Sequence, residues 1–179
     1  PPLGKEERIQ NKKPKNKTQV SDEDANLIRS MVIYQDDSVI VLNKIPGLAV
    51  QGGTNTKSHV DGMLDALKGD KKERPKLVHR LDKDTSGVLV LARTGVAAKK
   101  LAESFKHRNT NKIYWALVKG RPPQTDGVIN APLDKEPGAG GERMMVSDVG
   151  KRAVTDFKII DSAAGEATWM AFRPVTGRT

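Results

Sequence analysis

The sequence contains no cysteine, no long apolar run and only three histidines. Without cysteine there is no disulfide and no cysteine-ligated zinc, and such a chain fits a reducing compartment. No segment approaches the roughly 18 consecutive apolar residues that a membrane helix needs, and the first residues lack the apolar segment of a secretory signal. His59, His79 and His107 do not have the spacing of metal ligands. We therefore expect a cytoplasmic protein without a metal site.

Positive charge is what the sequence has in excess. Lys and Arg number 31 against 22 Asp and Glu, which gives a formal net charge of +9. Such a balance suits a polyanionic partner, because contacts to phosphates release condensed counterions. A solvated basic surface that only serves solubility is the alternative. The positive residues gather in two stretches, 68–80 and 99–121, which favours a nucleic-acid partner.

The chain changes character near residue 31. Residues 1–30 are polar, with lysine-rich and acidic stretches but no apolar periodicity, which predicts a linker or tail. Residues 31–179 carry the apolar patterns of one folded domain. The chain ends abruptly in PVTGRT (174–179), so we expect the C-terminal part of this domain to be missing.

The first half of the predicted domain alternates between short strands and a helix. Apolar runs predict strands over 38–44 and 48–51. A helix follows over 58–69, and its buried face carries Val60, Met63, Leu64 and Leu67 at helical spacing. Ser58 with Asp61 resembles a capping box at its start.

The second half is richer in strands than in helices. Residues 87–93 are apolar on both faces, which predicts a strand in the centre of a sheet. An amphipathic helix is predicted over 96–107, with Ala97, Leu101 and Phe105 on its buried face. Further strands are predicted over 112–120, 128–133, 153–160 and 167–173. The strand over 112–120 should place Trp115 and Leu117 on one face and Tyr114, Ala116 and Val118 on the other. Glycines 138, 140 and 141 predict a flexible loop before GERMMV. This order predicts an α+β fold with a mixed, mainly antiparallel sheet.

The segment HRLDKDTSG (79–87) places five charged or titratable side chains beside the apolar strand that follows it. In an extended segment Arg80 and Asp82 point to one side and Leu81 points to the other. A carboxylate at the edge of an apolar sheet is partly desolvated and needs a cation or hydrogen bonds to stay ionised.

Three interpretations of this segment are open. It is a tight turn in which DTSG satisfies backbone groups; or Asp82 and Asp84 are paired carboxylates of a hydrolase; or Asp82 alone acts on a base or sugar of a nucleic acid. The lysine between the two aspartates weakens the second interpretation. Composition does not separate the second from the third.

Several segments together resemble the RluA-type pseudouridine synthases, which convert uridine to pseudouridine in RNA. LVHRLDKDTSGVLVLA (77–92) resembles the family's signature, and VIVLNKIPGLAVQGG (39–53) resembles its first strand pair. KIYWALVKG (112–120) resembles the second motif, and PVTGRT (174–179) resembles the start of the third. The resemblance spans residues 32–179, and its connecting segments are similar to the RluC-like branch, which modifies large-subunit ribosomal RNA.

The resemblance implies roles for individual residues. Asp82 matches the catalytic aspartate, which attacks the ribose C1′ or assists cleavage of the glycosidic bond. Tyr114 matches a tyrosine that stacks on the target uracil, although the strand pattern alone would equally fit a core aromatic residue. Arg178 matches the arginine that pairs with the aspartate, and Arg80 matches a residue that fills the gap left by the flipped base. Candidate phosphate contacts are Lys83, Lys99, Lys100, Lys106 and Arg108.

The implied enzyme uses no cofactor or metal and acts as a monomer on RNA. The resemblance also implies an RNA-binding domain of the S4 type before residue 1. Two other classes remain as alternatives: a non-catalytic RNA-binding factor that has kept the fold, and a carboxylate-dependent glycoside hydrolase.

Overall fold

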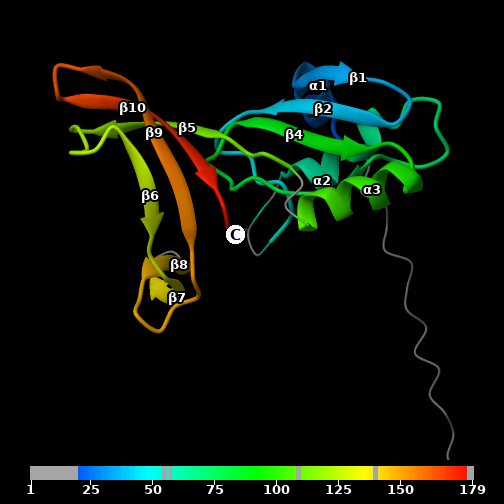
Figure 1. Ribbon diagram of the computed structural model, residues 1–179. Helices are drawn as coiled ribbons and strands as arrows, with labels where there is room; N and C mark the ends of the chain where they lie inside the picture. Colours follow the sequence, from blue (N-terminus) through cyan, green and yellow to red (C-terminus); the bar gives the residue numbers. More distant parts are fainter. Residues whose placement is uncertain (1–19, 54–55, 57, 108–109, 139–140, 177–179) are drawn as a thin grey trace, which may run out of the picture. The chain divides into compact units, whose positions relative to one another are not determined.

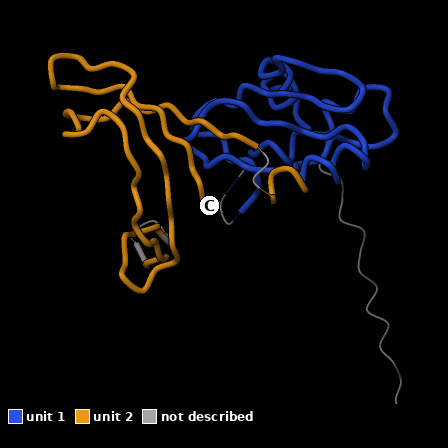
Figure 2. The backbone as a smooth tube through the Cα atoms, in the orientation of Figure 1, with its two compact units in different colours: residues 1–102 blue, residues 103–179 orange. Residues whose placement is uncertain are grey.

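The computed structural model describes residues 20–53, 56, 58–107, 110–138 and 141–176. They belong to two compact units, 1–102 and 103–179 (Figure 2), where the sequence predicted one domain after residue 30. Neighbouring strands of this described part pair antiparallel, and helices accompany the sheets, so the predicted α+β class is confirmed. None of the helices in these ranges is long and apolar enough to cross a membrane.

Unit 1 contains a sheet of four strands in the order β1-β2-β4-β3. Figure 1 shows β1, β2 and β4 of this sheet side by side. The strands are β1 (Val32–Gln35), β2 (Val39–Lys44), β3 (Lys76–Leu77) and β4 (Gly87–Ala92). The strands predicted over 38–44 and 87–93 are thus confirmed, and β4 lies inside the sheet as expected. Ile40 and Leu42 of β2 pair with Leu91 and Leu89 of β4, and all four side chains are fully buried.

The prediction of a tail was wrong for residues 22–30, which form helix α1 (Asp22–Ser30). The Ser21 hydroxyl caps this helix by accepting a hydrogen bond from the Asp24 amide at 3.2 Å. Three acidic residues occupy the first turn, where they complement the helix dipole. Ala25 and Ile28 are buried. Two apolar positions three residues apart, surrounded by polar residues, were too few to reveal the helical pattern in the sequence. Residues 1–19 lie outside the described part of the chain.

The predicted helix over 58–69 forms as two short pieces, α2 (Val60–Met63) and the 3₁₀ helix η1 (Leu64–Leu67). Its four predicted apolar positions are buried, and both pieces pack against α1. The capping box was wrong, because the Ser58 hydroxyl instead donates to the Asp24 carboxylate at 2.7 Å. The strand predicted over 48–51 was also wrong: within it the structure has only a single bridge, from Ala49 to His59.

Helix α3 (Gly95–Lys106) follows β4 and confirms the predicted helix over 96–107. The three residues expected to be buried in it, Ala97, Leu101 and Phe105, are half-buried. The boundary between the two units falls inside this helix.

Unit 2 contains a second sheet, in the order β5-β10-β9-β6, and a hairpin of two strands. The sheet strands are β5 (Tyr114–Lys119), β6 (Asp126–Asn130), β9 (Val154–Ala163) and β10 (Ala167–Pro174), and the hairpin strands are β7 (Leu133–Gly138) and β8 (Gly141–Val146). The neighbouring strands predicted over 153–160 and 167–173 are confirmed by the β9–β10 pairing. The predicted loop of glycines before GERMMV is a hairpin, because its glycines 138 and 141 end β7 and begin β8.

The two faces of the second sheet differ in exposure. Along β5, Tyr114, Ala116 and Val118 are half-buried, while Trp115 and Leu117 are 68% and 76% exposed. The sequence predicted this alternation. Trp115 also contacts Trp169 of β10 edge to face, with ring centroids 5.0 Å apart.

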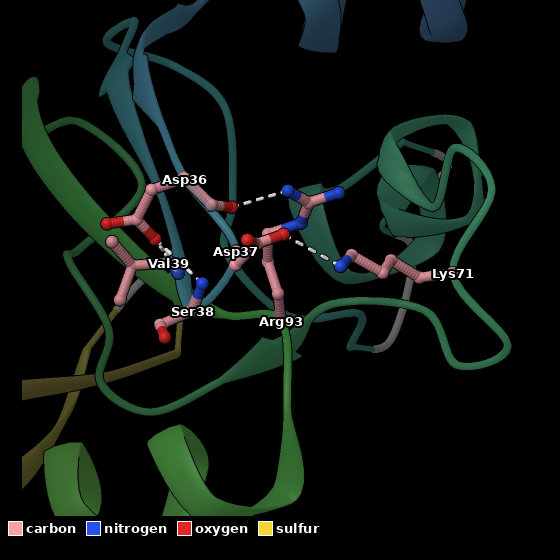
Figure 3. A network of polar contacts seen from close by, with 6 residues as sticks. All are labelled: Asp36, Asp37, Ser38, Val39, Lys71 and Arg93. Atoms are coloured by element: carbon pink, nitrogen blue, oxygen red, sulfur yellow. Dashed lines mark hydrogen bonds and ion pairs between the residues drawn. The ribbon is translucent and has the colours of Figure 1, made fainter.

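A carboxylate organises the turn between β1 and β2 (Figure 3). Asp36 accepts hydrogen bonds from the amides of Ser38 and Val39 at 2.7 and 2.8 Å, and from the Tyr34 hydroxyl at 3.0 Å. The backbone carbonyl of Asp36 accepts a bond from Arg93, which follows β4. The three bonds to its carboxylate, that of the Val39 amide first, lower the pKa of Asp36. The turn is therefore tied to the neighbouring end of β4.

One buried residue of unit 1 is a lysine. Lys44 follows Ile40 and Leu42 on the buried face of β2 and has no exposed surface. Its ammonium donates hydrogen bonds to the backbone carbonyls of Ile45, Leu48 and Lys83, at 2.9, 2.7 and 3.0 Å. Because Lys83 lies 39 residues further on, Lys44 connects the loop after β2 to the segment before β4.

We predict that the stabilising effect of Asp36 depends on pH. Its pKa is lowered in the folded state, so its contribution is complete above the unfolded pKa of about 3.9 and disappears as pH falls through the folded pKa. Asp36→Ala should lower the urea midpoint of unfolding at pH 6, and this difference from the wild type should shrink at pH 3. Circular dichroism measures both midpoints. Equal differences at the two pH values would contradict the assignment.

We predict that Lys44→Met destabilises the protein by about 3 kcal/mol, because an unpartnered buried carbonyl costs about 1–3 kcal/mol and removal of a buried charge offsets part of the loss of three bonds. Urea unfolding followed by circular dichroism gives the value. The matched control is Lys83→Met, which removes an exposed side chain and keeps the backbone carbonyl; we expect it to change stability by less than about 0.5 kcal/mol. A loss for Lys44→Met no larger than that of the control would show that the three bonds contribute little.

Candidate active site

The charged segment HRLDKDTSG lies between β3 and β4, within unit 1. Leu81 is buried, with 8% of its surface exposed, whereas Arg80 and Asp82 on either side of it are exposed. The predicted alternation is thus confirmed. Leu81 holds the segment to the core, and the two charged groups face solvent.

Backbone bonds fix the course of this segment. The Thr85 amide donates to the Asp82 carbonyl at 3.1 Å, which closes a turn around Lys83 and Asp84. His79, at the start of the segment, accepts a bond through Nε2 from the Val90 amide in β4 at 2.9 Å. This contact requires an unprotonated Nε2, so the imidazole acts as a neutral anchor rather than a cation.

Lys44 supports the same turn from the core side. Its bond to the Lys83 carbonyl reaches the residue that directly follows Asp82. Burial lowers the pKa of the Lys44 amine, while the nearby carboxylates of Asp84 and, more weakly, Asp82 oppose that shift. The turn therefore has a cation below it within unit 1. Lys44 also distinguishes the two aspartates, because it interacts more strongly with Asp84 than with Asp82.

Lys44 was not among the site residues predicted from the sequence. A signal was present: residues 40, 42 and 44 share one face of β2, so a lysine in phase with two core residues had to be buried and paired. The cation predicted to pair with Asp82 is Arg178, which lies outside the described residues together with Arg108.

The basic stretch 68–80 is largely neutralised. Lys71 pairs with Asp37 at 2.8 Å (Figure 3), and Lys76 pairs with Glu73 at 2.5 Å. Arg74 pairs with two carboxylates of the α2–η1 segment, Asp61 at 2.8 Å and Asp65 at 3.6 Å. Half of the six positive residues of this stretch thus balance local acids, and it is a weaker anion-binding surface than the sequence suggested.

Other predicted contact residues are exposed. Lys83 lies in the turn, and Lys99, Lys100 and Lys106 lie on α3. Within the described ranges none of these four side chains makes an ion pair.

Tyr114, the second predicted catalytic residue, begins β5 in unit 2. It is half-buried and lies opposite Phe172 of β10 in the sheet register. Its face of the sheet is the less exposed one, with Ala116 and Val118. Asp82 and Tyr114 belong to different units, and each is placed within its own.

Comparisons with known proteins agree on one family. A family model described as RNA pseudouridylate synthase matches residues 38–179, which include the turn around Asp82 and the strand that carries Tyr114. The chain is 42% identical to RNA pseudouridine synthase 4, mitochondrial, of Arabidopsis thaliana over 92% of its own length and 39% of the relative. It is 37% identical to ribosomal large subunit pseudouridine synthase C of Rickettsia bellii, over 82% of the chain and 49% of that relative.

A solved structure gives the same result for the fold. Human RNA Pseudouridylate Synthase Domain Containing 4 superposes with a TM-score of 0.70 at 29% identity, covering 86% of the chain and 62% of the human protein. The chain thus spans less than half of the Arabidopsis and Rickettsia relatives named above. The match of the family model to 142 of 179 residues, from Ser38 to the last, shows that the chain belongs to the RNA pseudouridylate synthase family.

Proposed function

We propose that the protein containing this chain isomerises uridine to pseudouridine in RNA, with Asp82 as the catalytic group. The observation that supports this most directly is the turn itself: Asp82 is exposed, while Leu81, His79 and the Lys83 carbonyl on either side of it are fixed to the core. A group held in this way is pre-oriented toward a substrate, which lowers the entropic cost of reaction. Membership of the family identifies RNA as the substrate class.

The proposed reaction requires one bond exchange within the nucleotide. The N1–C1′ bond of uridine breaks, a C5–C1′ bond forms, and the proton of C5 is lost while N1 gains one. A carboxylate suits this chemistry as a nucleophile at C1′ or as a group that assists cleavage. The exchange conserves all atoms and electrons, so it needs no redox or group-carrying cofactor.

We assign the remaining roles from the motif matches. Tyr114 stacks on the target uracil, Arg178 pairs with Asp82, and Arg80 fills the gap that the flipped base leaves. Arg80 is exposed next to Leu81, on the same side of the segment as Asp82, which supports that assignment.

We further propose large-subunit ribosomal RNA as the target, in the cytoplasm and by a monomeric enzyme. The name of the Rickettsia relative supports the ribosomal target. The name of the Arabidopsis relative places that protein in mitochondria, and the location of this protein stays a prediction from its sequence.

We predict that Asp82→Asn lowers the rate of pseudouridine formation by about 10³-fold or more, because it removes the reacting group. RNA labelled with tritium at C5 of uridine releases tritium to water on each turnover, which gives the rate. RNA affinity, measured by fluorescence anisotropy, should change by less than about threefold, since one exposed carboxylate is replaced by an isosteric amide.

Asp84→Asn is the matched control for this experiment, because Asp84 is a carboxylate of the same turn. We expect it to retain activity within about tenfold, because Asp84 is not the proposed reacting group and, of the two aspartates, it acts more strongly on the buried Lys44. Equal and complete losses in the two variants would instead favour the paired carboxylates of a hydrolase. Full activity of Asp82→Asn would refute its catalytic role.

The ribosomal target is tested in cells. Deleting the gene that encodes this chain should remove one or more pseudouridines from large-subunit ribosomal RNA, and a copy that carries Asp82→Asn should not restore them. Sequencing after carbodiimide treatment maps the sites. If the ribosomal profile is unchanged but another RNA loses pseudouridine, the proposed activity stands and the proposed ribosomal target is rejected.

A further inference from the structure

A cavity in unit 2 has no role in the function proposed so far. It has a volume of about 520 Å³ and opens between the last turn of α3, the segment before β5 and the end of β10. This size lies within the range of ligand pockets, about 300–1,000 Å³. Its lining residues are Phe105, Lys106, Thr110, Asn111, Lys112, Arg173, Pro174 and Val175.

The charges around this cavity are positive and only partly balanced. Arg173 donates two bonds to the Asp156 carboxylate, at 3.0 and 2.6 Å, and so forms a neutral pair. Lys106 and Lys112 make no ion pair within the part of the chain that the structure describes. Two ammonium groups at one cavity favour an anionic ligand.

The other lining groups suit more than a bare anion. Asn111 carries both a donor and an acceptor on its amide, and Thr110 carries a hydroxyl that does both, so they can bind the polar edge of a base. Phe105 and Pro174 supply apolar surface. A cavity with a few polar groups and some apolar wall fits a nucleoside phosphate better than inorganic phosphate alone.

The cavity also lies close to the residue proposed to stack on the target uracil. Lys112 comes two residues before Tyr114, and the alternation of exposure along 111–114 places both on the less exposed side. Phe172 lies opposite Tyr114 in the sheet, and Pro174 of the cavity follows Phe172 by two residues on the same face. The cavity therefore continues the Tyr114 face beyond the start of β5.

We propose that this cavity binds a nucleotide of the RNA strand next to the target uridine, with its phosphate between Lys106 and Lys112 and its base against Asn111. This inference rests on the proposed function, since it assumes an RNA substrate. It adds a subsite that selects single-stranded RNA near the modified position and that holds the strand on the Tyr114 side of unit 2.

The test compares two double variants of the 179-residue chain that lose the same charge. Lys106→Ala/Lys112→Ala changes the cavity. Lys119→Ala/Lys158→Ala removes two exposed lysines of the same unit that lie outside the cavity lining. The probe is a fluorescein-labelled single-stranded oligouridylate of eight residues. We expect the cavity variant to bind at least about tenfold more weakly and the control to change by at most about twofold.

Salt dependence separates a phosphate contact from a change of fold. Loss of one phosphate contact should reduce the slope of log affinity against log salt by about 0.7 for single-stranded RNA, and the control should keep the wild-type slope. Lys106→Arg/Lys112→Arg keeps the charge and should restore binding to within about threefold. Circular dichroism shows whether each variant is folded.

A third variant distinguishes a nucleotide from phosphate. Asn111→Ala should weaken binding of uridine 5′-monophosphate while leaving inorganic phosphate binding unchanged, as measured by shifts of the Thr110 amide resonance in nuclear magnetic resonance. Equal effects on both ligands, or none on either, would contradict base recognition.

The outcomes also separate this proposal from the one on which it depends. If the wild-type chain binds RNA and both double variants lose affinity equally, the subsite is rejected and the proposed function stands. If the protein that contains this chain forms no pseudouridine in the tritium-release assay, the proposed function itself fails.

Discussion

The arrangement of the candidate active site depends on the ammonium group of Lys44. A charged group without exposed surface has lost its hydration, and only strong partners make that position tolerable. Three carbonyls supply those partners, two from the loop after β2 and one from the turn that carries Asp82. Because the buried ammonium depends on these three carbonyls for its hydrogen bonds, the loop and the turn are held at a fixed distance from each other. The turn that carries the exposed carboxylate of Asp82 is thereby fixed to the core.

The two units use their apolar residues differently. In unit 1 the facing strands and three helical segments bury a continuous set of aliphatic side chains. In unit 2 the buried set within the described residues is small, mainly Val154, Thr168 and Met170, while Trp115 and Leu117 are largely exposed. Fewer buried contacts lower the free energy needed for local opening. We therefore expect the strand that carries Tyr114 to be held less firmly than the turn that carries Asp82.

Sequence patterns predicted what depends on alternation along one strand. The exposure of Arg80 and Asp82 around Leu81 follows from a period of two, and so does the exposure of Trp115 and Leu117. Sequence patterns failed where a residue's hydrogen-bond partner lies far away in the sequence. Ser58 bonds to Asp24 rather than to its own helix, and only the fold brings these two residues together.

The basic residues show the same limit. Counting charges along the chain made 68–80 a candidate for phosphate binding, but Asp37, Asp61 and Asp65 become partners only when the strands and helical turns assemble. Helix α1 was missed for a related reason: its two buried residues become core residues only when α1 packs against the α2–η1 segment. The role of Arg178 remains a prediction from the motif and that of Arg108 a prediction from the basic stretch 99–121, since both residues lie outside the described part of the chain.

The pair formed by Trp115 and Trp169 has a spectroscopic consequence. These are the two tryptophans of the whole sequence, and both belong to unit 2, 5.0 Å apart on its second sheet. Indole emission of the intact chain therefore originates from that sheet alone, and the unit with Asp82 is dark at the same wavelength. Quenching or a shift of this emission when RNA is added would register events at the Tyr114 sheet without any label. The chain thus has an intrinsic reporter for one of its halves.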